Sequence, residues 1–218
     1  KGMNGIIQEW KCLLKTKSIG TDSDRALLLD FQATLETKPE KAIKLEKDAL
    51  AQIDTTTVDT ARLVSNLHPN LGGLYRMNGH PDLAREHMEK SISLLDQFNL
   101  LHINDSIPQI ANYAMFLTEQ QEPERGISEL QKLSGIIKEY HSDDCLDYAK
   151  VQETLGTIYL MTANLPQAKT HFKRAFKIYE KIWADEPEMI EAKYQEIQEL
   201  YPQIGFCIGK NLSGLLTK

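Results

Sequence analysis

A repeat with a period of 42 residues is the feature that most constrains what this chain can fold into. Small residues recur at Gly72, Ala114 and Gly156, each 42 positions after the one before. A second series of small residues follows the first by twelve positions, at Ala84, Gly126 and Ala168. Self-similarity at a fixed period of about 20 to 50 residues is typical of proteins built from stacked copies of one unit. We therefore expect a repeat array.

Each copy predicts two helices joined by a short turn. Apolar residues in the second element recur at steps of three or four, which is the spacing of one face of a helix. The clearest stripes are Ala84, Met88, Ile92, Leu95 and Phe98, and Ala168, Phe172, Ala175, Tyr179 and Ile182. Proline is favoured in the first turn of a helix, and it recurs where the second helix would begin, at Pro39, Pro81, Pro123 and Pro166. Such a hairpin cannot bury its apolar face alone, so we expect neighbouring hairpins to stack.

The predicted fold class is all-α: an α-α superhelix of antiparallel helix hairpins with terminal capping helices. We interpret residues 1–218 as a single repeat domain, with copies at about 23–64, 65–106, 107–148 and 149–190. The first copy is the most divergent, because Asp30 stands at its small position. Residues 3–15 predict an amphipathic helix in an N-terminal segment, 3–22. Two further helices, 188–201 and 203–216, are expected to form the C-terminal cap over 191–218.

At these residues the chain resembles the tetratricopeptide repeat family. The fourth copy carries the family pattern at Leu155, Gly156, Tyr159, Ala168, Phe172 and Ala175, and the second carries it at Leu71, Gly72, Tyr75 and Ala84. The standard repeat has about 34 residues. The longer period found here is similar to that of kinesin light chains and of peptide-sensing bacterial regulators. The resemblance implies a right-handed superhelix whose first helices line a concave groove that binds a protein or peptide.

The resemblance also implies which residues would meet that ligand. In the long-repeat relatives, an Asn just before the apolar–small pair often bonds the peptide backbone; here this position holds Asn70, Asn112 and Thr154. An amide side chain suits the task because it both donates and accepts hydrogen bonds. Helical position adds further groove candidates: Asn66, Arg76, Met115, Glu119, Lys150, Glu153 and Thr157. The alternative is that these residues are solvated polar side chains and that Asn70 and Asn112 only join neighbouring helices.

No pattern in the sequence predicts catalysis. Residues 205–211 resemble a phosphate loop, but one residue is missing between the glycines and Asn211 replaces the required Ser or Thr. None of the six histidines has the i, i+4 partner of a helical zinc site, although His80 and His87 lie on adjacent predicted elements. The cysteines show no metal-binding or redox spacing: Cys12, Cys145 and Cys207. We therefore expect no enzyme activity, no metal and no cofactor.

Composition narrows the classes of partner. The net charge is 25 − 31 = −6, which gives no support for nucleic-acid binding. No apolar run of about 18 residues predicts a membrane span, and the cysteine usage favours a reducing compartment such as the cytoplasm. We expect a scaffold that binds a protein or peptide; the alternative is the peptide-sensing regulatory part of a larger signalling protein. Homodimer formation through the terminal helices is a further alternative, with an apolar stripe of Ile208, Leu212, Leu215 and Leu216.

Overall fold

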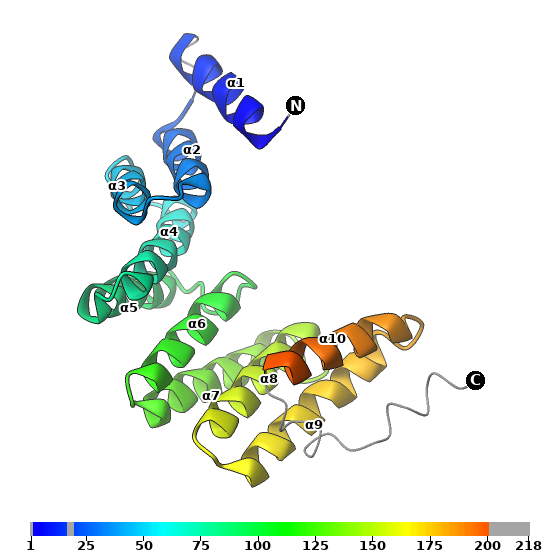
Figure 1. The fold of residues 1–218 in the computed structure, drawn as a ribbon. Helices are drawn as coiled ribbons and strands as arrows, with labels where there is room; N and C mark the ends of the chain where they lie inside the picture. The colour runs from blue at the N-terminus through cyan, green and yellow to red at the C-terminus, as the bar shows by residue number, and fades with distance from the viewer. Residues whose placement is uncertain (1, 17–19, 201–218) are drawn as a thin grey trace. The chain divides into compact units, whose positions relative to one another are not determined.

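The computed structural model describes residues 2–16 and 20–200, and these residues form ten helices and no strand (Figure 1). The predicted all-α class of paired helices is therefore confirmed. The chain divides into two compact units, Lys1–Gln109 and Ile110–Lys218. The predicted helix over 203–216, its apolar stripe and the loop-like segment 205–211 lie outside the described residues. The predicted single domain with its four repeat bounds stays a prediction.

The first unit contains two helix hairpins and an N-terminal helix. Its helices are α1 (Met3–Thr16), α2 (Asp22–Leu35), α3 (Pro39–Leu50), α4 (Val58–Met77) and α5 (Pro81–Gln97). The pairs α2/α3 and α4/α5 pack as hairpins, and α3 also packs against α4. Ala26, Ala49 and Leu67 form one buried cluster from three of these helices. At the start of the unit, Trp10 of α1 meets Phe31 of α2 edge-on, with ring centroids 6.1 Å apart.

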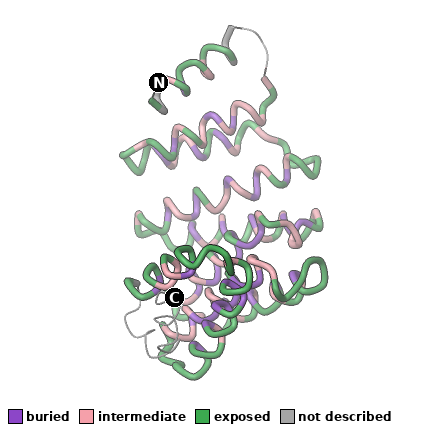
Figure 2. Tube along the Cα trace, turned by 90° about the vertical axis from the view of Figure 1, so that its right-hand side faces the viewer, coloured by how far each residue is buried: buried purple, intermediate pink, exposed green. Residues whose placement is uncertain are grey.

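The second unit repeats this arrangement. Its helices are α6 (Ser106–Glu119, whose first four residues fall within the range of the first unit), α7 (Pro123–Tyr140), α8 (Leu146–Met161), α9 (Leu165–Ile182) and α10 (Pro187–Leu200). Helix α8 packs against α9 and α7, and α9 contacts α10. Buried residues recur along each helix between exposed ones (Figure 2). The core includes large side chains that are almost fully buried: Phe116, Leu130, Tyr148, Phe172 and Tyr179.

Helix starts and stops follow the repeat. Proline occupies the first or second position of α3, α5, α7 and α9, as predicted. A left-handed residue closes the first helix of three hairpins, at Gly79 (φ 75°), Gln121 (φ 64°) and Ala163 (φ 58°). These three positions are 42 residues apart. The same backbone turn therefore recurs at one repeat position even where the residue is not glycine, the residue that adopts it at no steric cost.

The recurrent small residues lie where two helices of a hairpin cross. A Cβ atom added at Gly126 would come within 2.6 Å of the Ala114 carbonyl oxygen, and one added at Gly156 within 3.0 Å of the Phe172 ring. Most of the predicted apolar stripe in α9 is fully buried: Ala168, Phe172, Ala175 and Tyr179. The prediction is wrong for Ile182, which is 40% exposed at the last residue of the helix. Because the two helices approach closely at these crossings, a small residue is needed at the same position of each repeat.

Candidate functional site

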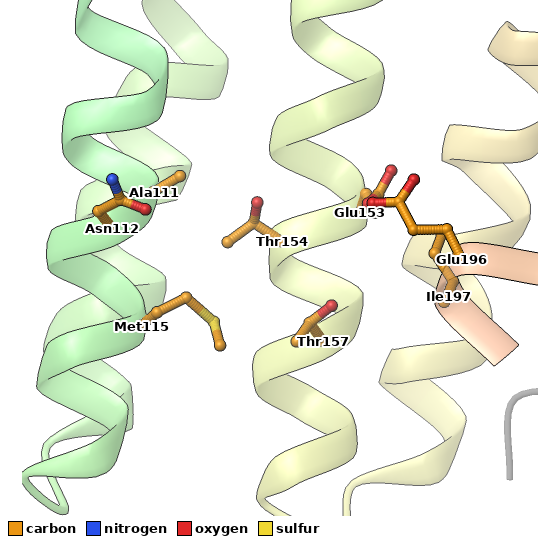
Figure 3. Close-up of a pocket in the computed structure, with 8 residues that line it drawn as sticks. All are labelled: Ala111, Asn112, Met115, Glu153, Thr154, Thr157, Glu196 and Ile197. Carbon is orange, nitrogen blue, oxygen red and sulfur yellow. The ribbon is translucent and has the colours of Figure 1, made fainter. Parts of the chain in front are cut away.

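The second unit contains a cavity between α6, α8 and α10 (Figure 3). Its volume is about 230 Å³. The lining residues mix apolar, hydroxyl, amide and carboxylate groups: Ala111, Asn112, Met115, Glu153, Thr154, Thr157, Glu196 and Ile197. Four predicted groove residues are among them: Asn112, Met115, Glu153 and Thr157. The structure brings them together because each pair is three or four positions apart on its own helix.

Asn112 and Thr154 occupy the same repeat position on α6 and α8, but their side chains differ in what they contact. Figure 3 shows Asn112 and Met115 on α6 opposite Thr154 and Thr157 on α8. The Thr154 hydroxyl donates to the Lys150 carbonyl oxygen of its own helix at 3.0 Å. Asn112 is exposed, and its amide has no hydrogen-bond partner within residues 2–16 and 20–200. The free donor and acceptor of Asn112 therefore border an open cavity.

The acidic side of the cavity is held by a network of partners. Glu153 accepts a hydrogen bond of 2.6 Å from the Tyr179 hydroxyl, and the Lys193 ammonium lies 3.1 Å from both Glu153 and Glu196. Burial first, and then the charge of Glu153, raise the pKa of Tyr179. Burial alone would lower the pKa of Lys193, but the two carboxylates raise it overall. These groups fix α8, α9 and α10 together, so Glu153 already has partners in the unbound protein.

Lys150 does not line this cavity. It is exposed, lies 3.7 Å from Asp147, and borders a neighbouring space of about 290 Å³ between α8, α9 and α10. The other walls of that space are mainly apolar: Leu146, Tyr179, Trp183, Met189 and Ala192, with Lys193 and Glu196. Lys150 and Asn112 therefore belong to adjacent hollows on the same unit.

Two predicted groove residues of the first unit, Asn66 and Asn70, already have hydrogen-bond partners within that unit. Asn70 borders a cavity of about 290 Å³ between α2, α3 and α4, but its amide donates to Asp30 at 2.8 Å. Asn66 accepts a hydrogen bond from Gln109. These contacts match the alternative in which the asparagines join neighbouring helices. Arg76 and, on the second unit, Glu119 are exposed and line none of the three cavities.

Two buried polar pairs in the first unit were missed by the sequence reasoning. The first joins His68 to His87, whose Nδ1 atoms are 2.9 Å apart. Burial first, and then His87, lower the pKa of His68 to about 4. The second is Glu46 beside Asp30. Burial, followed by the hydrogen bond with Asp30 and its charge, raises the pKa of Glu46 to about 9. The only sequence signal for these pairs was that Asp30 departs from the small-residue position.

A metal site and a membrane-spanning helix each set requirements on the described part of the chain. Within it, no group of three or more His, Cys, Asp or Glu side chains is arranged to hold a metal ion. His87 contacts His68 and stacks on Tyr75. None of the described helices is both long enough and apolar enough to cross a bilayer.

Comparison with known proteins shows what the repeat is similar to. The family model for the tetratricopeptide repeat matches residues 106–181. A search of curated protein sequences gives no match. Among solved structures, BtubC (BKLC) from P. vanneervenii superposes with a TM-score of 0.66 at 19% identity, over 82% of this chain and 71% of that one. A Podosopora anserina protein described as a kinesin light chain with nearly identical TPR-like repeats gives a TM-score of 0.63 at 14% identity, over 82% of this chain and 90% of that one. At these identities the likeness shows the fold, which confirms the predicted resemblance to kinesin light chain-type repeats.

Proposed function

Since the chain carries tetratricopeptide repeats, we propose that it is a protein-interaction scaffold and that the cavity between α6, α8 and α10 binds an extended segment of a partner protein. The observation that carries the proposal is that the Asn112 amide, at the edge of that cavity, has no hydrogen-bond partner among the described residues. A peptide backbone presents alternating N–H and C=O groups. A side chain that donates and accepts can pair with both, whatever the sequence of the peptide.

The remaining walls suit a side chain that enters between the helices. Met115, Ala111 and Ile197 supply apolar contact, and an unbranched thioether adapts to partners of different shape. Thr157 adds a hydroxyl on the opposite helix. Glu153 and Glu196 share Lys193, so they offer limited net charge. We expect a partner segment anchored by a medium-sized apolar residue and held mainly through its backbone.

The test uses two asparagines that differ in their contacts. The wild type, Asn112→Ala and Asn70→Ala are each used to capture partners, and captured segments are then measured as synthetic peptides by calorimetry. Asn112→Ala should weaken binding about tenfold, because one or two hydrogen bonds are worth about 1–2 kcal/mol. Asn70→Ala should leave this binding unchanged, because the Asn70 amide is already engaged by Asp30.

A second variant tests the cavity itself. Thr157→Phe should fill the space between α6 and α8 and abolish binding, while circular dichroism and the melting temperature stay close to the wild type. If Asn112→Ala and Thr157→Phe both bind captured peptides as well as the wild type does, the cavity is not the binding site.

A further inference from the structure

The cavity of the first unit has a different chemistry from that of the second. It lies between α2, α3 and α4, and the described residues that line it include one ionisable side chain, Glu46. The other lining residues are mostly apolar or small: Ala33, Thr34, Pro69, Asn70, Gly73, Leu74 and Met77. Met77 is 79% exposed. The site is therefore a partly apolar hollow whose lining includes a buried carboxyl group.

The repeat register shows how unusual this carboxyl is. Moving forward by 42 residues from Asp30 and Glu46 reaches Gly72 and Met88, then Ala114 and Leu130, then Gly156 and Phe172. In the later copies this position joins a small residue to a large apolar one; added Cβ atoms at Gly72 and Gly156 would touch Met88 and Phe172. In the first copy alone, two acidic residues occupy the same helix crossing.

The carboxyl cluster is incomplete among the described residues. Glu46 is only 2% exposed, and its Oε2 atom has no hydrogen-bond partner in the described structure. Asp30 accepts a hydrogen bond from the Asn70 amide nitrogen, which leaves the Asn70 carbonyl oxygen as an acceptor beside it. A buried acceptor without a donor destabilises a protein by about 1–3 kcal/mol. One buried acceptor at this crossing, the Glu46 Oε2 atom, therefore lacks a donor among the described residues.

We propose that this cavity binds the ammonium group of a lysine side chain from a partner protein, with Asp30, Glu46 and Asn70 as its acceptors. An ammonium group is a compact charge with three donors, which matches the number of acceptors. The methylene groups of the lysine would lie along Ala33, Leu74 and Met77, as long cationic side chains do on apolar surfaces. A metal ion fits less well, because the described residues contain no group of three metal-binding side chains.

Proton release follows from the same arrangement. Burial and Asp30 raise the pKa of Glu46 to about 9, so the carboxyl is protonated at pH 7. The charged group that raises the pKa of Glu46 is Asp30 on α2. Helix α4 contributes uncharged lining residues. Lys47 on α3 lies over the Tyr75 ring, 5.6 Å from its centroid. An incoming ammonium group favours the carboxylate. Binding should therefore release up to about one proton at pH 7 and strengthen as the pH rises towards 9.

The probe is the peptide Ac-Ala-Ala-Lys-Ala-Ala-NH2, titrated into the whole chain and followed by NMR. The expected result is a saturable shift, in the millimolar range, of the Asn70 side-chain amide and of the Glu46 carboxyl carbon, with the apparent pKa of Glu46 falling on binding. Matched peptides with ε-acetyl-lysine or norleucine should give at least tenfold weaker shifts. A peptide Ala-Ala-Ala-Ala-NH2 with a free N-terminus shows whether an α-ammonium group binds as well as lysine does, and an equal response would overturn the assignment to a side chain.

Variants taken from the chain's own repeats provide the controls. Asp30→Ala with Glu46→Leu copies Ala114 and Leu130 and should abolish the response while the protein stays folded. If that variant unfolds, Glu46→Gln keeps the neutral shape of the protonated acid and should still lower affinity about tenfold and remove proton release. The proposal is overturned if lysine and norleucine peptides give equal shifts, or if either variant binds lysine like the wild type. Asn112→Ala should not change this titration, so its outcome is independent of the function proposed for the second unit.

Discussion

The hairpins α4/α5 and α8/α9 have the same architecture but a different polar pair between their helices. In α4/α5, His68 contacts His87 at 2.9 Å, and His87 stacks on Tyr75. In α8/α9, 84 residues further on, Gln152 contacts His171 at 2.9 Å, and His171 stacks on Tyr159. The geometry is therefore repeated to the level of ring stacking, while one residue changes from His to Gln.

This difference shows that the repeat fixes positions and leaves the chemistry of each crossing to single residues. Burial lowers the pKa of His87 and of His171 alike. The additional His68 gives the α4/α5 hairpin a second group that resists protonation. The α2/α3 hairpin extends the comparison, because its crossing contains the Asp30–Glu46 pair instead of a small and an apolar residue. Each prediction below exchanges residues between equivalent positions or contrasts two positions on one helix.

Tryptophan fluorescence can separate the two units in these experiments. Trp10 contacts Phe31 in the first unit, and Trp183 stacks on Tyr179 in the second. The chain contains two tryptophans. A Trp183→Phe background therefore reports unfolding of the first unit, and a Trp10→Phe background reports unfolding of the second.

The largest effect is expected from Asp30→Ala with Glu46→Leu. Replacing a buried carboxyl pair by apolar residues should raise the free energy of unfolding of the first unit by about 1–4 kcal/mol. The folded pKa of Glu46 is about 9, against an ordinary 4.5, so the wild type loses stability as the pH rises between these values. Urea unfolding followed by Trp10 should therefore show a larger gain at pH 9 than at pH 6. A variant that is no more stable than the wild type at pH 9 would contradict the buried-acid account.

The next largest effect is expected from His68→Gln, which copies Gln152. The folded pKa of His68 is about 4, against an ordinary 6.5, so below pH 6.5 the unfolded chain binds more protons and the folded state loses stability. The wild type should lose roughly 2 kcal/mol more than the variant between pH 7 and about pH 4.5, since each unit of pKa shift corresponds to about 1.4 kcal/mol. Parallel pH profiles of the two proteins in urea unfolding would show that the His68–His87 pair does not control this loss. The reciprocal Gln152→His should make the second unit more sensitive to acid.

A smaller effect is expected from Gly126→Ala, which tests the close helix crossing of α6 and α7. The added methyl group would meet the Ala114 backbone, and such overpacking should destabilise the second unit by about 1–2 kcal/mol after the gain in helix propensity. Gly135→Ala on the same helix is the control, because a Cβ atom there meets nothing within 4 Å. It should stabilise by about 0.5–1 kcal/mol. Guanidinium unfolding followed by Trp183 would measure both, and equal effects would show that α7 can move away from α6 at little cost.

The smallest effect is expected at the left-handed turn positions. Ala163→Gly should stabilise the second unit by about 0.5–1 kcal/mol, because glycine adopts a positive φ without steric strain. The reciprocal Gly79→Ala should destabilise the first unit by about the same amount. Thermal unfolding of both variants would measure this, and a loss of stability in Ala163→Gly would indicate that this turn is not strained.

Much of the fold could be predicted from local sequence patterns. The prolines at the start of α3, α5 and α7 and the small residues at the crossings follow the 42-residue period, and the proline of α9 lies one position later. The structure places them as expected. The prediction that Ile182 is buried was wrong. Ile182 continues the apolar period to the last residue of α9, where its side chain is 40% exposed. Periodicity shows which face of a helix is apolar, but it does not show where packing against the next helix ends.

The candidate site was predicted only in part. Asn112 was placed in a groove by the family resemblance, and Met115, Glu153 and Thr157 by helical position; all four line one cavity. The same reasoning gave Asn70 an equal role, but Asn70 is bonded to Asp30. Asn70 and Asn112 occupy one repeat position and differ only in what the neighbouring helix presents: Asp30 beside Asn70, and no hydrogen-bonding partner among the described residues beside Asn112.

The sequence alone determined the repeat, its helix pairs and the small residues at their crossings, because these depend on residues within a few turns of one another. Only the tertiary structure decided which polar groups are paired and which are left without a partner. His68 and His87 are 19 residues apart, and Asp30 and Asn70 are 40 apart. Such pairs depend on how whole helices pack and on the rotamers that the packing allows, which no short-range pattern of residues encodes.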